Sequence, residues 1–111
     1  MSWFDFLGSP RAVPAHAPAP GGDRELVLYK FDACPYCLRV MRALKKLDVA
    51  VTLRDTMREP DARDALISAT GRTQVPCLFI DGEPLFESAD IVAWLEAHVA
   101  ANRGEAARAD G

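Results

Sequence analysis

The feature that most constrains this chain is the tetrapeptide Cys34-Pro35-Tyr36-Cys37, which lies between an apolar run and an amphipathic stretch. The apolar run covers residues 25–31 and predicts a strand buried on both faces, whereas residues 38–47 have helical spacing. A thiol at a strand-to-helix junction meets unpaired backbone N–H groups and the positive end of the helix dipole, and both favour the thiolate. Because the thiolate is the nucleophile in disulfide exchange, the motif predicts a redox site.

The size and composition of the chain fit one modest globular domain. It has 111 residues, half of them apolar, and a formal net charge of −3. Neither sign of charge forms long blocks, which argues against a nucleic-acid surface, and no apolar run approaches the roughly 20 residues that span a bilayer. The start of the chain lacks the pattern of a secretory signal, so we expect a cytoplasmic protein. Three cysteines with one Cys-x-x-Cys pair do not resemble a disulfide framework.

Composition divides the chain into three segments. Residues 1–23 begin with an aromatic tip and continue as a stretch rich in proline, alanine and glycine, which indicates a semi-extended linker. The tip consists of Trp3, Phe4, Phe6 and Leu7. This tip could anchor the chain to a partner or a membrane. Alternatively, its side chains could pack on the surface of the domain itself or be frayed, and the short length of the tip favours this second interpretation. Residues 24–101 form the domain, and residues 102–111 predict a flexible tail.

Within residues 24–101 the expected order is strand, helix, strand, helix, strand, strand, helix. A strand with alternating apolar residues covers 49–53, and the helix that follows begins at Pro60 and is ended by Gly71. Residues 77–80 and the strand beginning at 85–86 flank the turn signal Asp81-Gly82. The first two strands must be parallel and the hairpin antiparallel. The sequence therefore predicts an α/β fold, a four-stranded mixed sheet flanked by three helices.

Three motifs together resemble the glutaredoxins of the thioredoxin-like superfamily. They are the dithiol motif, Gln74-Val75-Pro76 and Glu87-Ser88-Ala89-Asp90-Ile91, which fall in the family order over about residues 25–100. The resemblance implies a thioredoxin-like fold and an enzyme that uses glutathione to reduce protein–glutathione mixed disulfides and protein disulfides. It implies a monomer whose partners are glutathione and glutathionylated or disulfide-bonded proteins, with no metal. The charge pattern and the apolar runs described above predict no nucleic-acid or membrane partner.

The resemblance also implies roles for the residues of the first two motifs. Cys34 would be the exposed nucleophile, and Cys37, one helical turn later, the resolving thiol. Tyr36 would pack beside the bound glutathione. Pro76 would follow a cis peptide bond, and Val75 would then offer its backbone to the cysteinyl part of glutathione like an added strand.

The third motif would bind the γ-glutamyl end of glutathione. Ser88 can cap the last helix, whose N-terminus is a ready anion site, and Asp90 could meet the γ-glutamyl ammonium group. Where many glutaredoxins have Gly-Gly, this chain has Phe86-Glu87, and Glu87-Ser88 resembles the pair in the N-terminal domain of glutathione transferases. Gln74 completes the expected glutathione-binding set.

The chain departs from the glutaredoxin pattern in its positive charge. Many members have a lysine three residues before the first cysteine, where this chain has Phe31. Lys30 lies one residue earlier, and strand alternation would point it to the opposite face. Arg54, Arg58 and Arg72 are alternative sources of positive charge.

Two other functions fit parts of the pattern. A glutathione transferase-like protein is favoured by Glu87-Ser88, although such enzymes add a large helical domain and only residues 102–111 follow here. An iron–sulfur carrier would hold a cluster with Cys34 and glutathione thiolates from two chains, a geometry that Pro35 disfavours. A zinc site would need two further ligands from Cys77, His16 and His98, none of which has ligand spacing.

Three residues outside these motifs carry simpler expectations. We expect Cys77 to be a small buried strand residue and Trp94 to pack in the core or on the surface. We expect His98 to face solvent or to cap the last helix.

Overall fold

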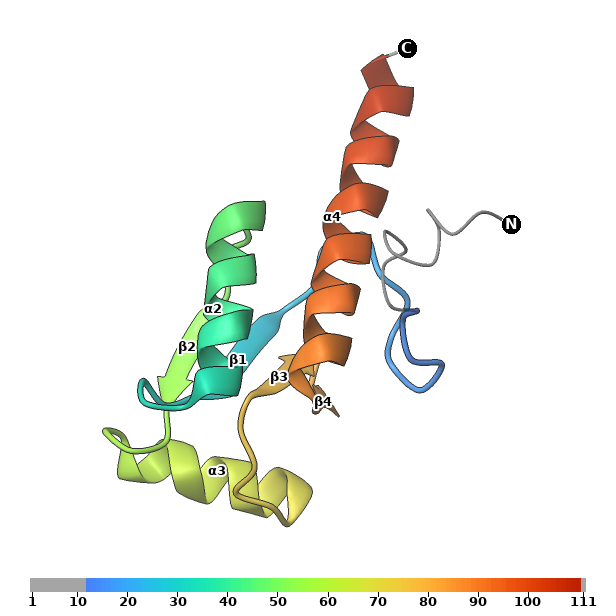
Figure 1. Cartoon of the computed structure of the whole chain (residues 1–111). Coiled ribbons are helices and arrows are strands. Elements are labelled where there is room, and N and C mark those ends of the chain that lie inside the picture. The colour runs from blue at the N-terminus through green and yellow to red at the C-terminus, as the bar shows by residue number, and fades with distance from the viewer. Residues whose placement is uncertain (1–11, 111) are drawn as a thin grey trace.

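The structure is a computed structural model that describes residues 12–110, with side chains through residue 104. The predictions for the aromatic tip lie outside the described residues. Figure 1 shows the elements in the expected order. They are β1 (Leu26–Lys30), α2 (Pro35–Leu47), β2 (Thr52–Asp55), α3 (Pro60–Thr70), β3 (Cys77–Ile80), β4 (Glu83–Leu85) and α4 (Ser88–Asp110).

The four strands form one mixed sheet in the order β2-β1-β3-β4. The β1 strand is parallel to β2 and antiparallel to β3, and β3 is antiparallel to β4. The α/β class and the predicted order are therefore confirmed. Two boundaries differ from prediction. The backbone N–H of Val49 still bonds to Leu44 O at 3.1 Å, so β2 begins only at Thr52. The two-residue turn pairs Glu83 directly with Ile80, so β4 begins earlier than expected.

The sheet has a core on each face. Helices α2 and α4 lie side by side over one face, and α3 lies apart from them (Figure 1). The larger core, the α2/α4 core, consists of Leu26, Leu28, Val40, Leu44, Leu78, Ile80, Leu85, Ile91, Trp94 and Leu95. The α3 core consists of Tyr29, Ala62, Leu66 and Cys77. Because strand side chains alternate, β1 contributes Leu26 and Leu28 to one core and Tyr29 to the other.

The stretch predicted as a linker packs on α4, and we call residues 13–24 the N-terminal strap. Val13 and Ala17 pack against the α2/α4 core. Trp94 Nε1 donates a 2.7 Å hydrogen bond to Pro18 O, and Gly21 N donates a 2.8 Å bond to His98 Nδ1. Side-chain groups of α4 thus satisfy backbone groups of the strap.

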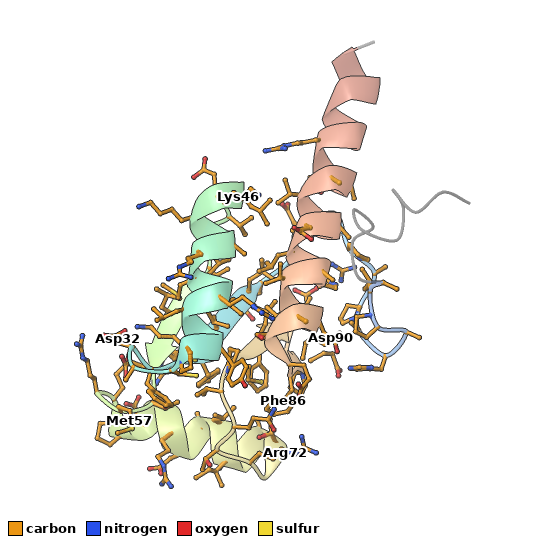
Figure 2. All side chains as sticks on the ribbon, in the orientation of Figure 1. Asp32, Lys46, Met57, Arg72, Phe86 and Asp90 are labelled. Carbon is orange, nitrogen blue, oxygen red and sulfur yellow. The ribbon has the colours of Figure 1, made fainter. Side chains whose placement is uncertain are left out.

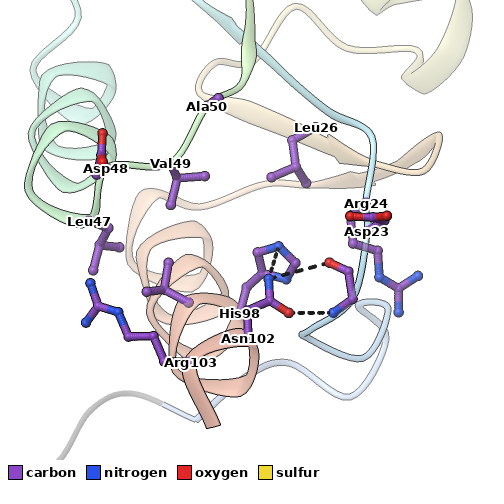
Figure 3. A pocket seen from close by; sticks show the side chains of 12 residues that line it. Asp23, Arg24, Leu26, Leu47, Asp48, Val49, Ala50, His98, Asn102 and Arg103 are labelled. Atoms are coloured by element: carbon purple, nitrogen blue, oxygen red, sulfur yellow. Dashed lines mark hydrogen bonds between the residues drawn. The ribbon is translucent and has the colours of Figure 1, made fainter. Parts of the chain in front are cut away.

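His98 is part of the contact between the N-terminal strap and α4. Its ring stacks on Trp94 with centroids 4.6 Å apart, and both residues are buried. The expectation that His98 faces solvent or caps the helix is therefore wrong, whereas core packing of Trp94 is confirmed. His98 and Asn102 line a cavity of about 490 Å³ between the strap and the C-terminal end of α2 (Figure 3).

Helix α4 is longer than the sequence patterns indicated. It continues through residues 102–110, which the sequence analysis assigned to a flexible tail. Alanine is the strongest helix former, and residues 100–109 contain five alanines, which accounts for the helical backbone. Among residues 12–110, no helix is long and apolar enough to cross a membrane.

Candidate active site

Cys34 occupies the N-cap position of α2. Its φ and ψ of −80° and 119° are extended, and its Sγ accepts a 3.4 Å hydrogen bond from Cys37 N. Pro35 at the first helical position lacks an N–H and fits the helical φ. The sulfur therefore folds back over the end of the helix, and this explains why Cys34 is only 7% exposed. The predicted position at the helix start is confirmed, but the expected exposure of the nucleophile is wrong.

Cys37 is buried one turn further along α2. Burial raises the pKa of its thiol to about 12, while the backbone of Phe31 opposes this rise. Cys37 is therefore a protonated thiol at neutral pH. Both cysteines of the motif are free thiols in the structure.

A cleft of about 510 Å³ lies beside the first turns of α2 and α4. Six residues predicted to bind glutathione line it, namely Tyr36, Gln74, Val75, Pro76, Glu87 and Ser88. They come from α2, from the loop before β3 and from the start of α4. The peptide bond between Val75 and Pro76 is cis, as the resemblance implied. The fold thus brings together segments that are about 50 residues apart in the sequence.

The start of α4 forms one wall of the cleft. Glu87 has a φ of 71°, and its carbonyl accepts the first helical hydrogen bond from Ile91 N at 3.0 Å. Glu87 is therefore the cap residue of α4. Ser88, which the sequence analysis expected to cap this helix, is instead the first residue of α4 and is buried. Asp90 belongs to the first turn of α4 but not to the residues that line the cleft.

Positive charge enters the cleft from a residue that the sequence analysis missed. Arg39 lines the cleft three residues after Tyr36, a spacing that places both on one face of α2. The spacing of three residues from Tyr36 could have predicted Arg39 as a residue of the cleft. The guanidinium of Arg72 lies 5.1 Å above the ring of Phe86, whose neighbour Glu87 lines the cleft (Figure 2).

The two other candidate arginines are engaged elsewhere. Arg54 pairs with Glu59 at 3.0 Å and with Asp61 at 2.8 Å. Arg58 pairs with Asp32 at 3.0 Å, in the loop before the dithiol motif.

Lys30 lies closer to the dithiol than the sequence analysis expected. Its side chain is 12% exposed, and Nζ lies 2.7 Å from Asp32 Oδ1 and 3.4 Å from Asp55 Oδ2. Its charge also lowers the pKa of the Cys37 thiol, against the larger effect of burial. The expectation that Lys30 points away from the site is wrong.

The third cysteine lies in the α3 core. Cys77 is fully buried, as predicted, and burial raises its pKa to about 12. Within residues 12–104, whose side chains the structure describes, no group of three or more His, Cys, Asp or Glu residues is placed to hold a metal ion.

The sheet order, the helix positions and the paired thiols define a thioredoxin-like protein with a Cys-x-x-Cys site. The same fold occurs in a mutant of the thioredoxin-like protein BC3987, which is 28% identical, with 57% of this chain and 85% of that chain covered at a TM-score of 0.53. Comparison with protein families matches residues 26–85, more than half of the chain, to Glutaredoxin. The chain belongs to the glutaredoxin family.

Solved glutaredoxins agree with this assignment. Oxidized glutaredoxin 2 from Chlamydomonas reinhardtii is 27% identical, with 76% of this chain and 83% of that chain covered at a TM-score of 0.55. Wheat glutaredoxin is 25% identical, with coverages of 68% and 78% and a TM-score of 0.55. Several glutathione transferases also match, but the chain spans only 17% to 38% of their length. No curated protein matches the chain.

Proposed function

We propose that this protein is a glutathione-dependent oxidoreductase that reduces protein–glutathione mixed disulfides and protein disulfides. The observation that best supports the proposal is the position of the cleft. Tyr36 and Arg39, from the helix that Cys34 caps, line the same cleft as Val75 and Glu87. Ligand pockets typically have volumes of about 300–1,000 Å³, and a cleft of about 510 Å³ lies within that range.

The residues of the cleft suit the three parts of glutathione. The backbone of Val75 can pair with the cysteinyl unit like an added strand. Ser88 and its neighbours offer backbone N–H groups of a helix N-terminus to the γ-glutamyl carboxylate. The carboxylate of Glu87 suits the γ-glutamyl ammonium group, and Arg39 suits the glycyl carboxylate at the other end.

Reduction of a mixed disulfide needs Cys34 alone. Its thiolate attacks the glutathione sulfur, a Cys34–glutathione disulfide forms, and the target protein leaves as a thiolate. Free glutathione then attacks that disulfide, releases glutathione disulfide and regenerates the Cys34 thiolate. With a protein disulfide as substrate, Cys37 attacks the mixed disulfide at Cys34, the intramolecular disulfide forms, and the second substrate thiolate leaves.

Two cysteine variants test this function. Cys34→Ser should abolish reduction of both a glutathionylated peptide and a protein disulfide such as that of insulin. Cys37→Ser should keep the first activity and lose most of the second. Full activity of Cys34→Ser would contradict the proposal, and a visible absorbance band in freshly purified protein would instead favour an iron–sulfur carrier.

A further inference from the structure

A second groove lies between α2 and β2, apart from the cleft that we propose binds glutathione. We call it the α2/β2 groove, and its volume is about 340 Å³. Apolar and charged side chains from α2, from the loop after it and from β2 line the groove, among them Met41, Lys45, Asp48, Val49, Val51 and Leu53. Strand β2 is an edge of the sheet, so no further strand of the described chain closes the groove on that side. The groove shares no lining residue with the cleft.

Apolar side chains at the surface connect this groove to the dithiol end of α2. Leu53 on the wall of the groove is 41% exposed, and Leu38 near the start of α2 is 43% exposed. Leu38 and Met41 are three residues apart, so they are neighbours on the helix surface. At 1.5 Å per residue, Met41 and Lys45 lie about 10 Å and about 16 Å along the helix from Cys34. A continuous row of apolar residues at the surface, unlike a single one, indicates an interaction site.

The exposed face of α2 carries only positive charge. The helix contains Arg39, Arg42, Lys45 and Lys46 but no acidic residue, although the chain as a whole has a net charge of −3. Arg39 lines the cleft, whereas the other three follow α2 away from it, and Lys46 lies at the opposite end of the helix from Asp32 and the dithiol motif (Figure 2). Within residues 12–104, none of these three side chains forms an ion pair or a side-chain hydrogen bond.

The arrangement of these cations does not stabilise the helix on its own. Arg42 precedes Lys45 by three residues and Lys46 by four, and these are the spacings at which like charges repel each other on a helix surface. Asp48, which also lines the groove, offsets only part of this positive charge. Because complementary potentials favour association, a negatively charged partner beside α2 would relieve the repulsion.

We infer that the α2/β2 groove is an exosite for protein substrates, which takes an acidic segment with an apolar side chain. The inference rests on the proposed function and deepens it. The apolar side chain packs against Met41 and Leu53, and the carboxylates of the segment lie beside Arg42 and Lys45. The substrate disulfide then reaches Cys34 at the start of the same helix. Three cations beside one groove suit a short peptide segment, whereas surfaces for anionic lipids carry about 4–8 basic residues.

Two glutathionylated peptides test the exosite. Each has one cysteine in disulfide linkage with glutathione, followed by a linker of about five glycine and serine residues, which spans about 16 Å when extended. In the acidic probe the linker leads to Glu-Leu-Glu-Glu, and in the neutral probe it leads to Ser-Ser-Ser-Ser. The kcat/KM for release of the peptide thiol is measured with both probes at about 20 mM and about 500 mM NaCl, where the Debye length changes severalfold.

The wild-type protein should prefer the acidic probe, and the preference should shrink as the salt concentration rises. Arg42→Gln and Lys45→Gln should each lower kcat/KM for the acidic probe by about 1.4- to 5-fold, the range for exposed ion pairs. Leu53→Ser should also lower it, because the apolar wall is lost. None of the three variants should change kcat/KM for the neutral probe, since none alters the cleft. Arg63→Gln, which removes an exposed arginine from α3, is the matched control.

Equal kcat/KM values for the two probes, a preference that salt does not weaken, or an equal loss in Arg63→Gln would overturn the inference. Co-sedimentation with phosphatidylserine vesicles that Lys45→Gln weakens, without a preference between the probes, would assign the surface to a membrane instead. A dimer in analytical ultracentrifugation that Leu53→Ser dissociates would assign the groove to a second copy of the chain. Failure of the wild-type protein to reduce either probe would contradict the proposed function itself.

Discussion

The side-chain amide of Gln74 donates a 3.1 Å hydrogen bond from Nε2 to Oε2 of Glu87. This bond joins the loop before β3 to the cap residue of α4, and both residues line the cleft. The carboxylate of Glu87 is therefore oriented before any ligand arrives. Its second oxygen offers a negative site at the end of the cleft where we place the γ-glutamyl ammonium group.

Glu87→Gln should weaken binding of glutathione. The amide can still accept from Gln74, so the shape of the cleft is kept while the charge is lost. Hydrogen bonds to charged groups contribute about 1.5–3 kcal/mol, which corresponds to a rise of about tenfold or more in KM for glutathione. Steady-state kinetics with varied glutathione measure this change. Glu83→Gln, on an exposed residue of β4, should leave KM unchanged. An unaltered KM in Glu87→Gln would remove Glu87 from the glutathione site.

Gly21→Ala should destabilise the fold more than Gly22→Ala. Both glycines have positive φ values, 101° and 78°, but only at Gly21 would a new Cβ meet another atom closely, at 3.0 Å from Ala101 Cβ. Unfavourable backbone conformations cost about 1–3 kcal/mol, and the close contact adds to this at Gly21. Urea unfolding measures both losses. A loss at Gly22 equal to or larger than that at Gly21 would show that the strap does not pack on α4 as described.

Local patterns in the sequence predicted most of the fold and the cleft. Apolar periodicity, Pro60, Gly71 and the Asp81-Gly82 turn act within a few residues, so they predicted the order of the strands and helices correctly, although the bounds of β2, β4 and α4 differ. The three motifs likewise located most of the cleft. What these patterns could not indicate was which distant surfaces meet.

The missed features depend on contacts between distant parts of the chain. The bond from Trp94 to Pro18 joins residues 76 positions apart, and no local pattern indicates such a partner. Lys30 was placed by alternation alone, but its relation to the site depends on where α2 crosses the sheet. Arg39 was missed because an exposed arginine on a helix is usually solvated, and only the cleft makes it relevant.

Cys77 should resist alkylation in the native protein. It is fully buried, and burial raises its pKa to about 12, so almost no thiolate exists at pH 8. Peptide mapping after brief treatment with iodoacetamide should find Cys77 unmodified, and the same treatment in denaturant should modify it. Cys77→Ala should retain full reductase activity. Rapid native modification of Cys77 would show that β3 opens readily.

The stability of the protein should fall as the pH is lowered from 7 to 5. Burial, assisted by the charge of Arg24, holds the pKa of His98 below its ordinary value of 6.5, and Nδ1 must stay unprotonated to accept from Gly21 N. Below pH 6.5 the unfolded state therefore binds the proton more readily than the folded state does. The contribution of neutral His98 to the free energy of unfolding is complete above this pH and is lost as the pH falls toward the folded pKa.

Urea unfolding at each pH measures the slope of the free energy of unfolding against pH. His98→Gln, which keeps an acceptor but does not titrate, should flatten the slope, and His16→Asn, on an exposed residue of the strap, should preserve it. An equally steep slope in His98→Gln would assign the pH dependence to other groups.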